Sequence, residues 1–212
     1  MLNSLPTLPH AALIALITLA VSGCNKERSY PVYRENPAPK DALPIVIRVH
    51  DAPMELALPK VFVWYEIDPL CLPPINNYEG VQYAPQRQSI EFPVQRVSAT
   101  EFTSTLFEDG MAVADYYGRG PCKWQFSIVR ASFPVTLEGH EGFISATAPR
   151  HELKELLTSV TFADKELTAQ SKSARPVWVR TQSQYSYEKL SDTEKGKYFP
   201  IEISSPSKGI TP

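Results

Sequence analysis

The sequence predicts a mainly β protein, with a single antiparallel β-sandwich-like domain and at most one short helix. Three observations support this fold class. Short runs of β-branched and aromatic residues recur along the chain between turn residues. Proline is abundant, at 20 residues against 9 glycines, and proline interrupts helices in their interior. Apolar residues recur at helical spacing in one segment only.

Two β-branched runs begin the predicted domain. Residues 45–50 and 61–67 are rich in valine, isoleucine and aromatic side chains. The second run is apolar on both faces up to Tyr65, which indicates a central strand. Residues 68–86 follow, with several prolines, two adjacent asparagines and a glycine, and they predict a long loop.

The middle of the chain predicts an interrupted strand and a hairpin. Residues 89–97 alternate apolar and polar side chains, but Pro93 within them indicates an edge strand or a bulge. An Asp-Gly pair at 109–110 separates the apolar runs 102–107 and 111–116, and this arrangement is typical of a β-hairpin.

The longest β pattern covers residues 123–137. Trp124 and Phe126 occupy even positions, whereas Phe133 and Val135 occupy odd positions. Because side chains alternate between the two faces of a strand, this change of parity indicates a bulge or two consecutive strands. A tight turn at 116–120 precedes this range.

The last third of the chain contains the predicted helix, over residues 149–160, where Leu153, Leu156, Leu157 and Val160 recur at helical spacing. Further strands are predicted at 143–147, 177–187 and 199–203. Residues 162–175 are polar and predict irregular structure. Residues 191–194 have the spacing of a capping box, but no apolar run follows, so a turn is predicted there.

The apolar segment 11–24 (AALIALITLAVSGC) ends in Val21-Ser22-Gly23-Cys24. This ending resembles the lipobox of bacterial lipoproteins, in which signal peptidase cuts before the cysteine and acyl chains are attached to it. The resemblance implies a signal peptide over 1–23 and lipidation of Cys24. The alternatives are an ordinary secretory signal or a short membrane anchor, although the run is shorter than the about 20 residues of a spanning helix. Residues 1–10 lack the Lys or Arg that such signals normally contain.

The polar, proline-bearing composition that follows predicts a flexible tether. The expected organisation is therefore a lipidated cysteine and tether over 24–43, a β-sandwich-like domain over 44–204 and a tail over 205–212. Asn25 follows the lipidated cysteine. In enterobacterial lipoproteins an Asp at this position retains the protein in the inner membrane, so the resemblance implies the outer membrane, facing the periplasm.

Cys71 and Cys122 remain when Cys24 is assigned to the lipid. An even pair of cysteines in an oxidising compartment predicts a disulfide. The chain-entropy model gives a loop of about 50 residues a stabilisation of roughly 4 kcal/mol. A zinc site is the alternative, but two isolated cysteines without CxxC spacing argue against it.

The sequence contains no recognisable catalytic motif: no GxSxG, no SxxK set, no glycine-rich phosphate loop and no HExxH. His50, His140 and His151 are far apart and are expected on the surface. Glu138 and Glu141 lie in a glycine-flanked turn. We therefore expect no enzyme activity, metal, cofactor or small-molecule substrate. The formal net charge of −2 also argues against nucleic acid as a partner.

The predicted disulfide would bring together two loops that are rich in tyrosine. Tyrosine and arginine on rigidly held loops are typical of protein-recognition surfaces. The candidate partner-binding residues are Tyr78, Glu79, Tyr83, Asp115, Tyr116, Tyr117 and Arg119. The alternative for each tyrosine is a place at the rim of the core with its hydroxyl group satisfied.

The lipobox, the chain length and the loops YEGVQY (78–83) and DYYGRGPCKW (115–124) together loosely resemble the lipoprotein immunity proteins that accompany type VI secretion effectors, especially periplasmic lipases. The resemblance implies a lipid-anchored, non-enzymatic protein that binds and inhibits a secreted toxin, such as a phospholipase, with Tyr117 and Arg119 as first contact candidates. The alternative is a structural lipoprotein subunit of an envelope or secretion machine. A small-ligand carrier or a hydrolase is the least favoured class, because no motif supports it.

Overall fold

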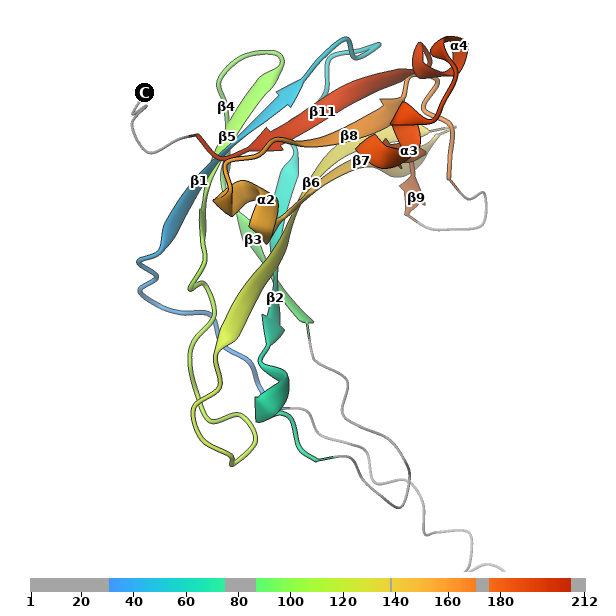
Figure 1. Cartoon of the computed structure of the whole chain (residues 1–212). Helices are drawn as coiled ribbons and strands as arrows, with labels where there is room; N and C mark the ends of the chain where they lie inside the picture. The colour runs from blue at the N-terminus through green and yellow to red at the C-terminus, as the bar shows by residue number, and fades with distance from the viewer. Residues whose placement is uncertain (1–30, 75–86, 138, 171–175, 207–212) are drawn as a thin grey trace, which may run out of the picture. The chain divides into compact units, whose positions relative to one another are not determined.

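The computed structural model describes residues 31–74, 87–137, 139–170 and 176–206. Residues 33–212 form one compact unit, to which the following description applies. Its two β-sheets confirm the predicted mainly β, sandwich-like fold (Figure 1).

The first sheet has six strands, which are β1 (Ala42–Val49), β4 (Val94–Arg96), β5 (Glu101–Phe107), β8 (Ser159–Asp164), β10 (Thr181–Ser183) and β11 (Tyr198–Ser204). Their order across the sheet is β10-β8-β11-β1-β5-β4. All of the pairings are antiparallel.

The second sheet has five strands, which are β2 (Lys60–Ile67), β3 (Arg87–Phe92), β6 (Trp124–Leu137), β7 (His140–Pro149) and β9 (Val177–Trp178). Their order is β3-β2-β6-β7-β9, and only the short β7–β9 pairing is parallel. The central position of β2 agrees with its apolar composition.

The core lies between the inner faces of the two sheets. Alternation along β1 and β11 turns isoleucines inward, and Phe102 of the first sheet meets Phe133 of the second with ring centroids 5.5 Å apart. Both phenylalanines are completely buried. Each buried side chain of this size contributes on the order of 1.5–3 kcal/mol of transfer free energy, so these inner faces drive the pairing of the sheets.

Pro93 separates two edge strands, as its position in the sequence predicts. The chain leaves β3 at the edge of the five-stranded sheet and enters β4 at the edge of the six-stranded sheet. Because proline has no N–H for a central ladder, an edge is where it costs least. The residue therefore marks the point at which the chain changes sheets.

The change of parity in β6 is a β-bulge, which confirms the prediction for residues 123–137. Trp64 pairs with Ile128, but the next residue of β2, Tyr65, pairs with Phe126. Ser127 is the additional residue. Its insertion lets Phe126 and Val129 both point into the core, although their spacing in the sequence is odd.

The hairpin predicted at 109–110 is not formed. Residues 111–116 make no strand, and Met111 has only an isolated bridge to Glu35. The Asp109 carboxylate instead accepts hydrogen bonds from the backbone N–H groups of Lys40, at 2.9 Å, and Asp41, at 3.0 Å. The Asp-Gly pair therefore binds the N-terminal segment of the domain rather than turning β5 back on itself.

Residues 33–41, which the composition assigned to the tether, are part of the domain. The Asn36 N–H donates to the Gly110 carbonyl oxygen at 2.8 Å, and the Ala112 N–H donates to the carbonyl of Arg34 at 2.9 Å. β1 then begins at Ala42 rather than after Pro44. Backbone hydrogen bonding does not require apolar side chains, so composition could not reveal this boundary.

The helices also differ from the prediction. The helix expected over 149–160 ends after α2 (Arg150–Lys154), and Leu156 has a positive φ of 58°. Within the described ranges there are two further α-helices, α3 (Gln184–Glu188) and α4 (Asp192–Lys195), and a 3-10 turn, η1 (Pro69–Cys71). Helix α4 has a complete capping box, so the spacing at 191–194 does begin a helix.

The ladders of the six-stranded sheet explain the remaining differences. Residues 159–164, expected to be helical and then irregular, pair with β11 along their length. The strand expected over 177–187 divides into β9, β10 and α3 because the chain passes from one sheet to the other. Residue Ser205, expected in the tail, is buried, and its hydroxyl donates to the carbonyl of Pro44 at 3.0 Å.

Candidate functional site

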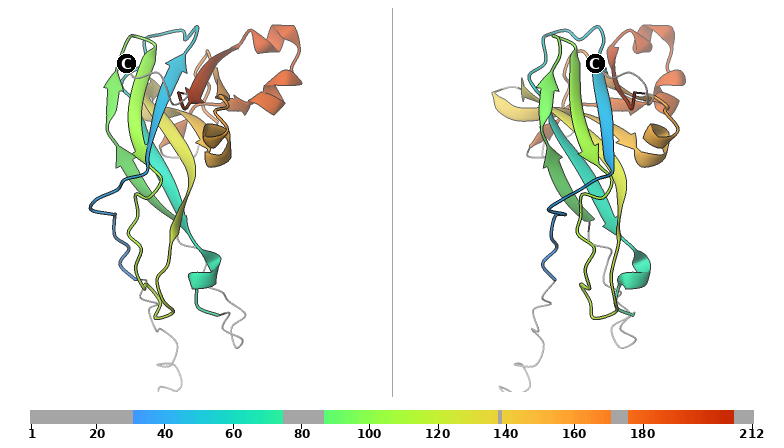
Figure 2. Two further views of the ribbon diagram at one scale, coloured as in Figure 1. Left: turned by 60° about the vertical axis from the view of Figure 1, so that its left-hand side comes forward. Right: turned by 90° about the vertical axis from the view of Figure 1, so that its left-hand side faces the viewer.

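A disulfide joins two segments at one end of the domain, as the cysteine count predicts. Cys71 at the end of η1 is bonded to Cys122, with their Cα atoms 5.6 Å apart. The Cys122 N–H also donates to the carbonyl of Ala114 at 2.9 Å. Figures 1 and 2 show η1 and the 111–122 segment at the opposite end of the domain from α3 and α4. We call this region the disulfide end.

The structure brings four of the seven candidate recognition residues together at the disulfide end. These are Asp115 and Arg119, which are exposed, and Tyr116 and Tyr117, which are half-buried. The other three candidates, Tyr78, Glu79 and Tyr83, lie outside the described residues, as do Cys24 and the rest of the lipobox.

The two described tyrosines pack against Tyr33. Its ring centroid lies 5.2 Å from that of Tyr116, and its hydroxyl forms a hydrogen bond with the Tyr117 hydroxyl. The Tyr116 hydroxyl donates to the carbonyl of Ala112 at 2.7 Å. Both side chains therefore help to attach residues 33–41 to the domain, which corresponds to the core-rim alternative for these tyrosines.

Asp115 organises the turn that carries Arg119. Its Oδ1 accepts hydrogen bonds from the N–H groups of Tyr117, at 3.3 Å, and Arg119, at 2.9 Å. Desolvation raises the pKa of the Asp115 carboxyl, but backbone N–H donors outweigh it and hold the pKa below its usual value. Gly118 and Gly120 have φ angles of 68° and 98°, which only glycine adopts at little cost.

Sequence reasoning missed two exposed apolar side chains at this end. Leu70 in η1 is 84 % exposed, and Val113 is 57 % exposed. Leu70 directly precedes Cys71, which forms the disulfide. Val113 directly precedes Ala114, whose carbonyl accepts the hydrogen bond from the Cys122 N–H. No sequence pattern distinguishes them from core residues, because isolated leucine and valine in a loop are compatible with either position.

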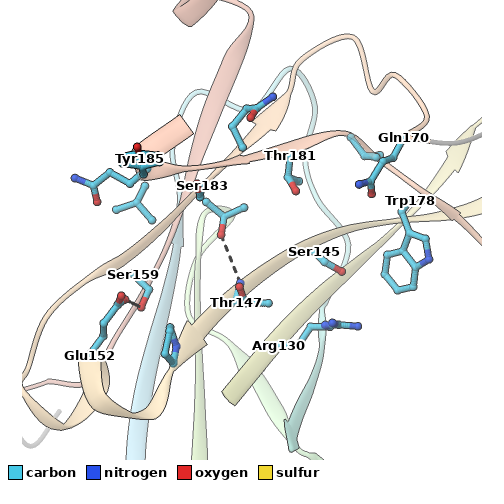
Figure 3. Close-up of a pocket in the computed structure, with 16 residues that line it drawn as sticks. Arg130, Ser145, Thr147, Glu152, Ser159, Gln170, Trp178, Thr181, Ser183 and Tyr185 are labelled. Atoms are coloured by element: carbon cyan, nitrogen blue, oxygen red, sulfur yellow. Dashed lines mark hydrogen bonds between the residues drawn. The ribbon is translucent and has the colours of Figure 1, made fainter. Parts of the chain in front are cut away.

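A pocket of about 840 Å³ lies elsewhere on the domain, between β7, β8, β10 and the start of α3 (Figure 3). It opens where the chain crosses from β9 in one sheet to β10 in the other. Its lining consists of Arg130, Ser145, Thr147, Pro149, Glu152, Ser159, Val160, Thr161, Gln170, Trp178, Val179, Thr181, Gln182, Ser183, Gln184 and Tyr185. Hydroxyl and amide side chains predominate, and no sequence motif pointed to this pocket.

The two charged groups of the pocket have different surroundings. The Ser159 hydroxyl donates a hydrogen bond to the Glu152 carboxylate. The Arg130 guanidinium lies over two aromatic rings, with Cζ 4.9 Å from the Trp64 centroid and 5.9 Å from that of Trp178. These cation–π contacts hold the guanidinium in place through its flat face. The N–H donors, which lie in the plane of the guanidinium, are not used by these contacts.

The remaining expectations concern histidines, metals and membranes. His50, His140 and His151 are all exposed, as predicted. Across the described ranges, no group of three or more His, Cys, Asp or Glu side chains is arranged to hold a metal ion. In the same part of the chain, no helix has the length and apolar character needed to span a bilayer.

Comparison with protein-family models, with curated proteins and with solved structures found no match to this chain.

Proposed function

We propose that this protein is a lipid-anchored immunity protein of the bacterial envelope, which binds and inhibits a secreted toxin, such as a phospholipase delivered by type VI secretion. The proposal assigns its function to binding, without catalysis. The observation that carries it is the exposed Leu70 side chain, held on a turn that the Cys71–Cys122 disulfide fixes to the opposite loop.

The disulfide end is organised before any partner binds. The disulfide, the Arg119–Leu72 hydrogen bond of 2.9 Å and the N–H donors around Asp115 all restrict the same two segments. A surface that is ordered in advance loses little conformational entropy on association. Rigidity of this kind supports a role in tight protein binding.

The exposed side chains suit a protein contact of moderate size. Leu70 and Val113 provide apolar area, and Asp115 and Arg119 provide charges of opposite sign at the same end of the domain. An apolar centre with a polar rim is the usual anatomy of such interfaces. We therefore assign the principal contacts to these four residues and a supporting role to Tyr116 and Tyr117, whose hydroxyls are used within the domain.

The chain enters the domain at the disulfide end, since Tyr33 packs against Tyr116 and Trp124. If Cys24 carries the lipid, only eight residues separate it from Tyr33, and this length spans at most about 30 Å. A toxin that attacks membrane lipids works within that distance of the bilayer. A short tether to the disulfide end therefore supports a lipid-degrading toxin as the partner.

The test is co-expression with each toxin encoded beside the gene. We expect one toxin to lose its growth inhibition in the presence of the wild-type protein, and the double variant Leu70→Asp, Val113→Asp to lose protection. Val97→Asp is the matched control, because Val97 is 59 % exposed between β4 and β5. Failure of protection against every neighbouring toxin would contradict the proposal. A deletion strain that stops secreting without poisoning itself would instead identify a structural subunit.

A further inference from the structure

The pocket between β7, β8 and β10 contains a cation whose hydrogen-bonding capacity is unused. Arg130 is half-buried, and no hydrogen bond or ion pair joins its guanidinium to any described residue. A guanidinium has five N–H donors, and those of Arg130 are accessible from the pocket, since Trp124 Nε1 is the only fully buried side-chain donor without a partner among the described residues. The position therefore favours a ligand that brings acceptor oxygens.

We propose that this pocket is a binding site for an acidic saccharide, in which Arg130 pairs with the carboxylate and the neighbouring hydroxyl and amide side chains bind the sugar hydroxyls. The site is separate from the disulfide end, so the proposal is independent of toxin binding. It also differs from the expectation that the chain has no small-molecule ligand, an expectation that rested on missing motifs alone.

The chemistry of the lining selects a polar, hydroxyl-rich ligand. Of the sixteen lining residues, nine are Ser, Thr or Gln, and only three are Pro or Val. Thr147 and Thr181 have hydroxyls, and Gln170 has a carboxamide, that make no hydrogen bond to another described residue. A purely apolar ligand would bury these groups without partners, at a cost of about 1–3 kcal/mol each. Sugar hydroxyls both donate and accept, which matches them.

The charged side chains that line the pocket favour a ligand with a single anionic group. Arg130 is the only cationic side chain of the lining, and Glu152 opposes any further negative charge. A polyphosphate or a nucleic acid would require several cations. A single planar carboxylate instead matches the planar fork of one arginine, which binds it in a bidentate manner.

Trp178 borders the proposed site, and the Arg130 guanidinium lies over its ring, 5.9 Å from the centroid. Trp178 lines the pocket beside Arg130, and one side of its indole contacts Phe143 at a centroid distance of 5.4 Å. In Figure 3, Arg130 and Ser145 lie in the lower part of the pocket, Thr181 and Gln170 lie above them, and Trp178 stands at the right. A carboxylate paired with Arg130 would therefore lie beside the indole, so the indole N–H can report on binding.

The size of the pocket also fits such a ligand. Its volume of about 840 Å³ lies within the range of about 300–1,000 Å³ that is typical of small-molecule sites. The elements that carry Arg130 and Thr147 are paired neighbours in one sheet, and Thr181 comes from the other sheet. Rigid strands therefore position the side chains that are proposed to bind the carboxylate and the sugar hydroxyls.

The experiment titrates the isotope-labelled domain with N-acetylmuramic acid, N-acetylneuraminic acid and galacturonic acid, each of which carries one carboxylate, with the methyl ester of galacturonic acid as the uncharged match. NMR follows the indole N–H of Trp178. We expect a saturable shift with at least one of the acids. Because a charge-assisted bidentate pair is involved, affinity for that acid should fall at least about tenfold in Arg130→Lys. Thr181→Val should weaken binding as well, and the esterified sugar should bind at least about tenfold more weakly than its acid.

Arg87→Lys is the matched control. Arg87 also lies over Trp64, at 6.0 Å, but its guanidinium is paired with Glu66 at 2.8 Å and it does not line the pocket. Its variant should bind like the wild type, and thermal melting should show every variant folded. No shift with any acid, or an equal affinity in Arg130→Lys, would overturn the proposal. Tighter binding of trialanine at the same residues would overturn it too, by assigning the pocket to a peptide carboxylate.

Discussion

Arg119 donates a hydrogen bond from Nη1 to the backbone carbonyl oxygen of Leu72, at 2.9 Å, next to the disulfide between Cys71 and Cys122. Two links of different chemistry therefore join the same pair of segments. The disulfide restricts the unfolded chain as well as the folded one, whereas the hydrogen bond acts only in the folded state. The two contributions can be measured separately.

Replacing both cysteines should destabilise the domain strongly. The disulfide closes a loop of 51 residues, for which the chain-entropy model gives about 4 kcal/mol. We expect Cys71→Ala, Cys122→Ala to lower the free energy of unfolding by an amount of that order in urea titrations. Arg119→Lys, which retains a charge and a donor, should cost less than about 1 kcal/mol. Equal stability of the double variant and the wild type would contradict the structural role of the bridge.

Tyr65 should make the free energy of unfolding depend on pH in the alkaline range. Its buried hydroxyl donates to the carbonyl of Phe107, and burial, followed by the charge of Asp109, raises the pKa of Tyr65. The folded state keeps the hydroxyl protonated, whereas an unfolded tyrosine ionises near pH 10. Stability from this group is therefore complete below about pH 10 and is lost as the pH rises further.

Tyr65→Phe should remove that part of the alkaline dependence. At pH 7 the variant should lose about 1 kcal/mol, the value of a typical buried hydrogen bond. Between about pH 10 and 11.5 the wild type should lose stability faster than the variant. Tyr185→Phe is the control, because Tyr185 is 69 % exposed. Parallel curves for the wild type and Tyr65→Phe would show that the hydroxyl ionises equally in both states.

Glu108 should make the stability depend on pH in acid. Desolvation raises its pKa, but hydrogen bonds and charges from Lys154 and Arg150, at 2.9 and 3.0 Å, outweigh it and lower the pKa. A lowered pKa in the folded state means that the stabilisation is present above the unfolded value of about 4.3 and disappears as the pH falls through the folded value. Glu108→Gln should therefore be less stable than the wild type at pH 7, by about 1 kcal/mol, and equally stable near pH 2.

The matched control for this ion pair is Glu55→Gln. Glu55 pairs with Arg96 at 3.2 Å, but its side chain is 71 % exposed, so its loss should change the stability by less than about 0.5 kcal/mol. A difference between Glu108→Gln and the wild type that persists unchanged at pH 2 would indicate a packing effect instead of a charge effect.

The features that could be predicted from the sequence are those that local patterns determine. Runs of β-branched and aromatic residues placed β1 and β11, and Pro93 marked an edge strand. The parity of Trp124 and Phe133 indicated a bulge or two strands within 123–137, and the structure locates a bulge at Ser127. Each of these depends on residues within one strand. The disulfide could be predicted as well, because it followed from the cysteine count and from the oxidising compartment that the lipobox resemblance implies, without any tertiary information.

Features that depend on distant partners could not be predicted. The Asp-Gly pair at 109–110 has the composition of a hairpin, but Asp109 bonds to Lys40, which is 69 residues away. The leucines at 156 and 157 have helical spacing, yet only Leu153 of that set is fully buried, because the ladder between β8 and β11 begins at Ser159. Tertiary pairing prevails over local propensity at these positions.

The pocket could not be inferred for the same reason. Its lining runs from Arg130 to Tyr185 and comes from both sheets, two helices and the segments between them. No two of its proposed ligand-binding residues, Arg130, Gln170 and Thr181, form a motif with known spacing. Their proximity results from the crossing of the chain from β9 to β10, which composition does not encode.

The final prediction concerns Cys24. Lipidation there would anchor the mature chain by acyl chains, each of which contributes about 0.8 kcal/mol for every buried CH₂ group. Cys24→Ser removes the acceptor sulfur, so the protein should keep its signal segment and lose the mass of the acyl groups, as mass spectrometry of the purified chain would show. Ser22→Ala is the control, because alanine preserves a small residue before the cleavage point. If the control and Cys24→Ser yielded the same mature mass, apart from the substituted atoms, the protein would not be lipidated, and the proximity of the disulfide end to the bilayer would lose its basis.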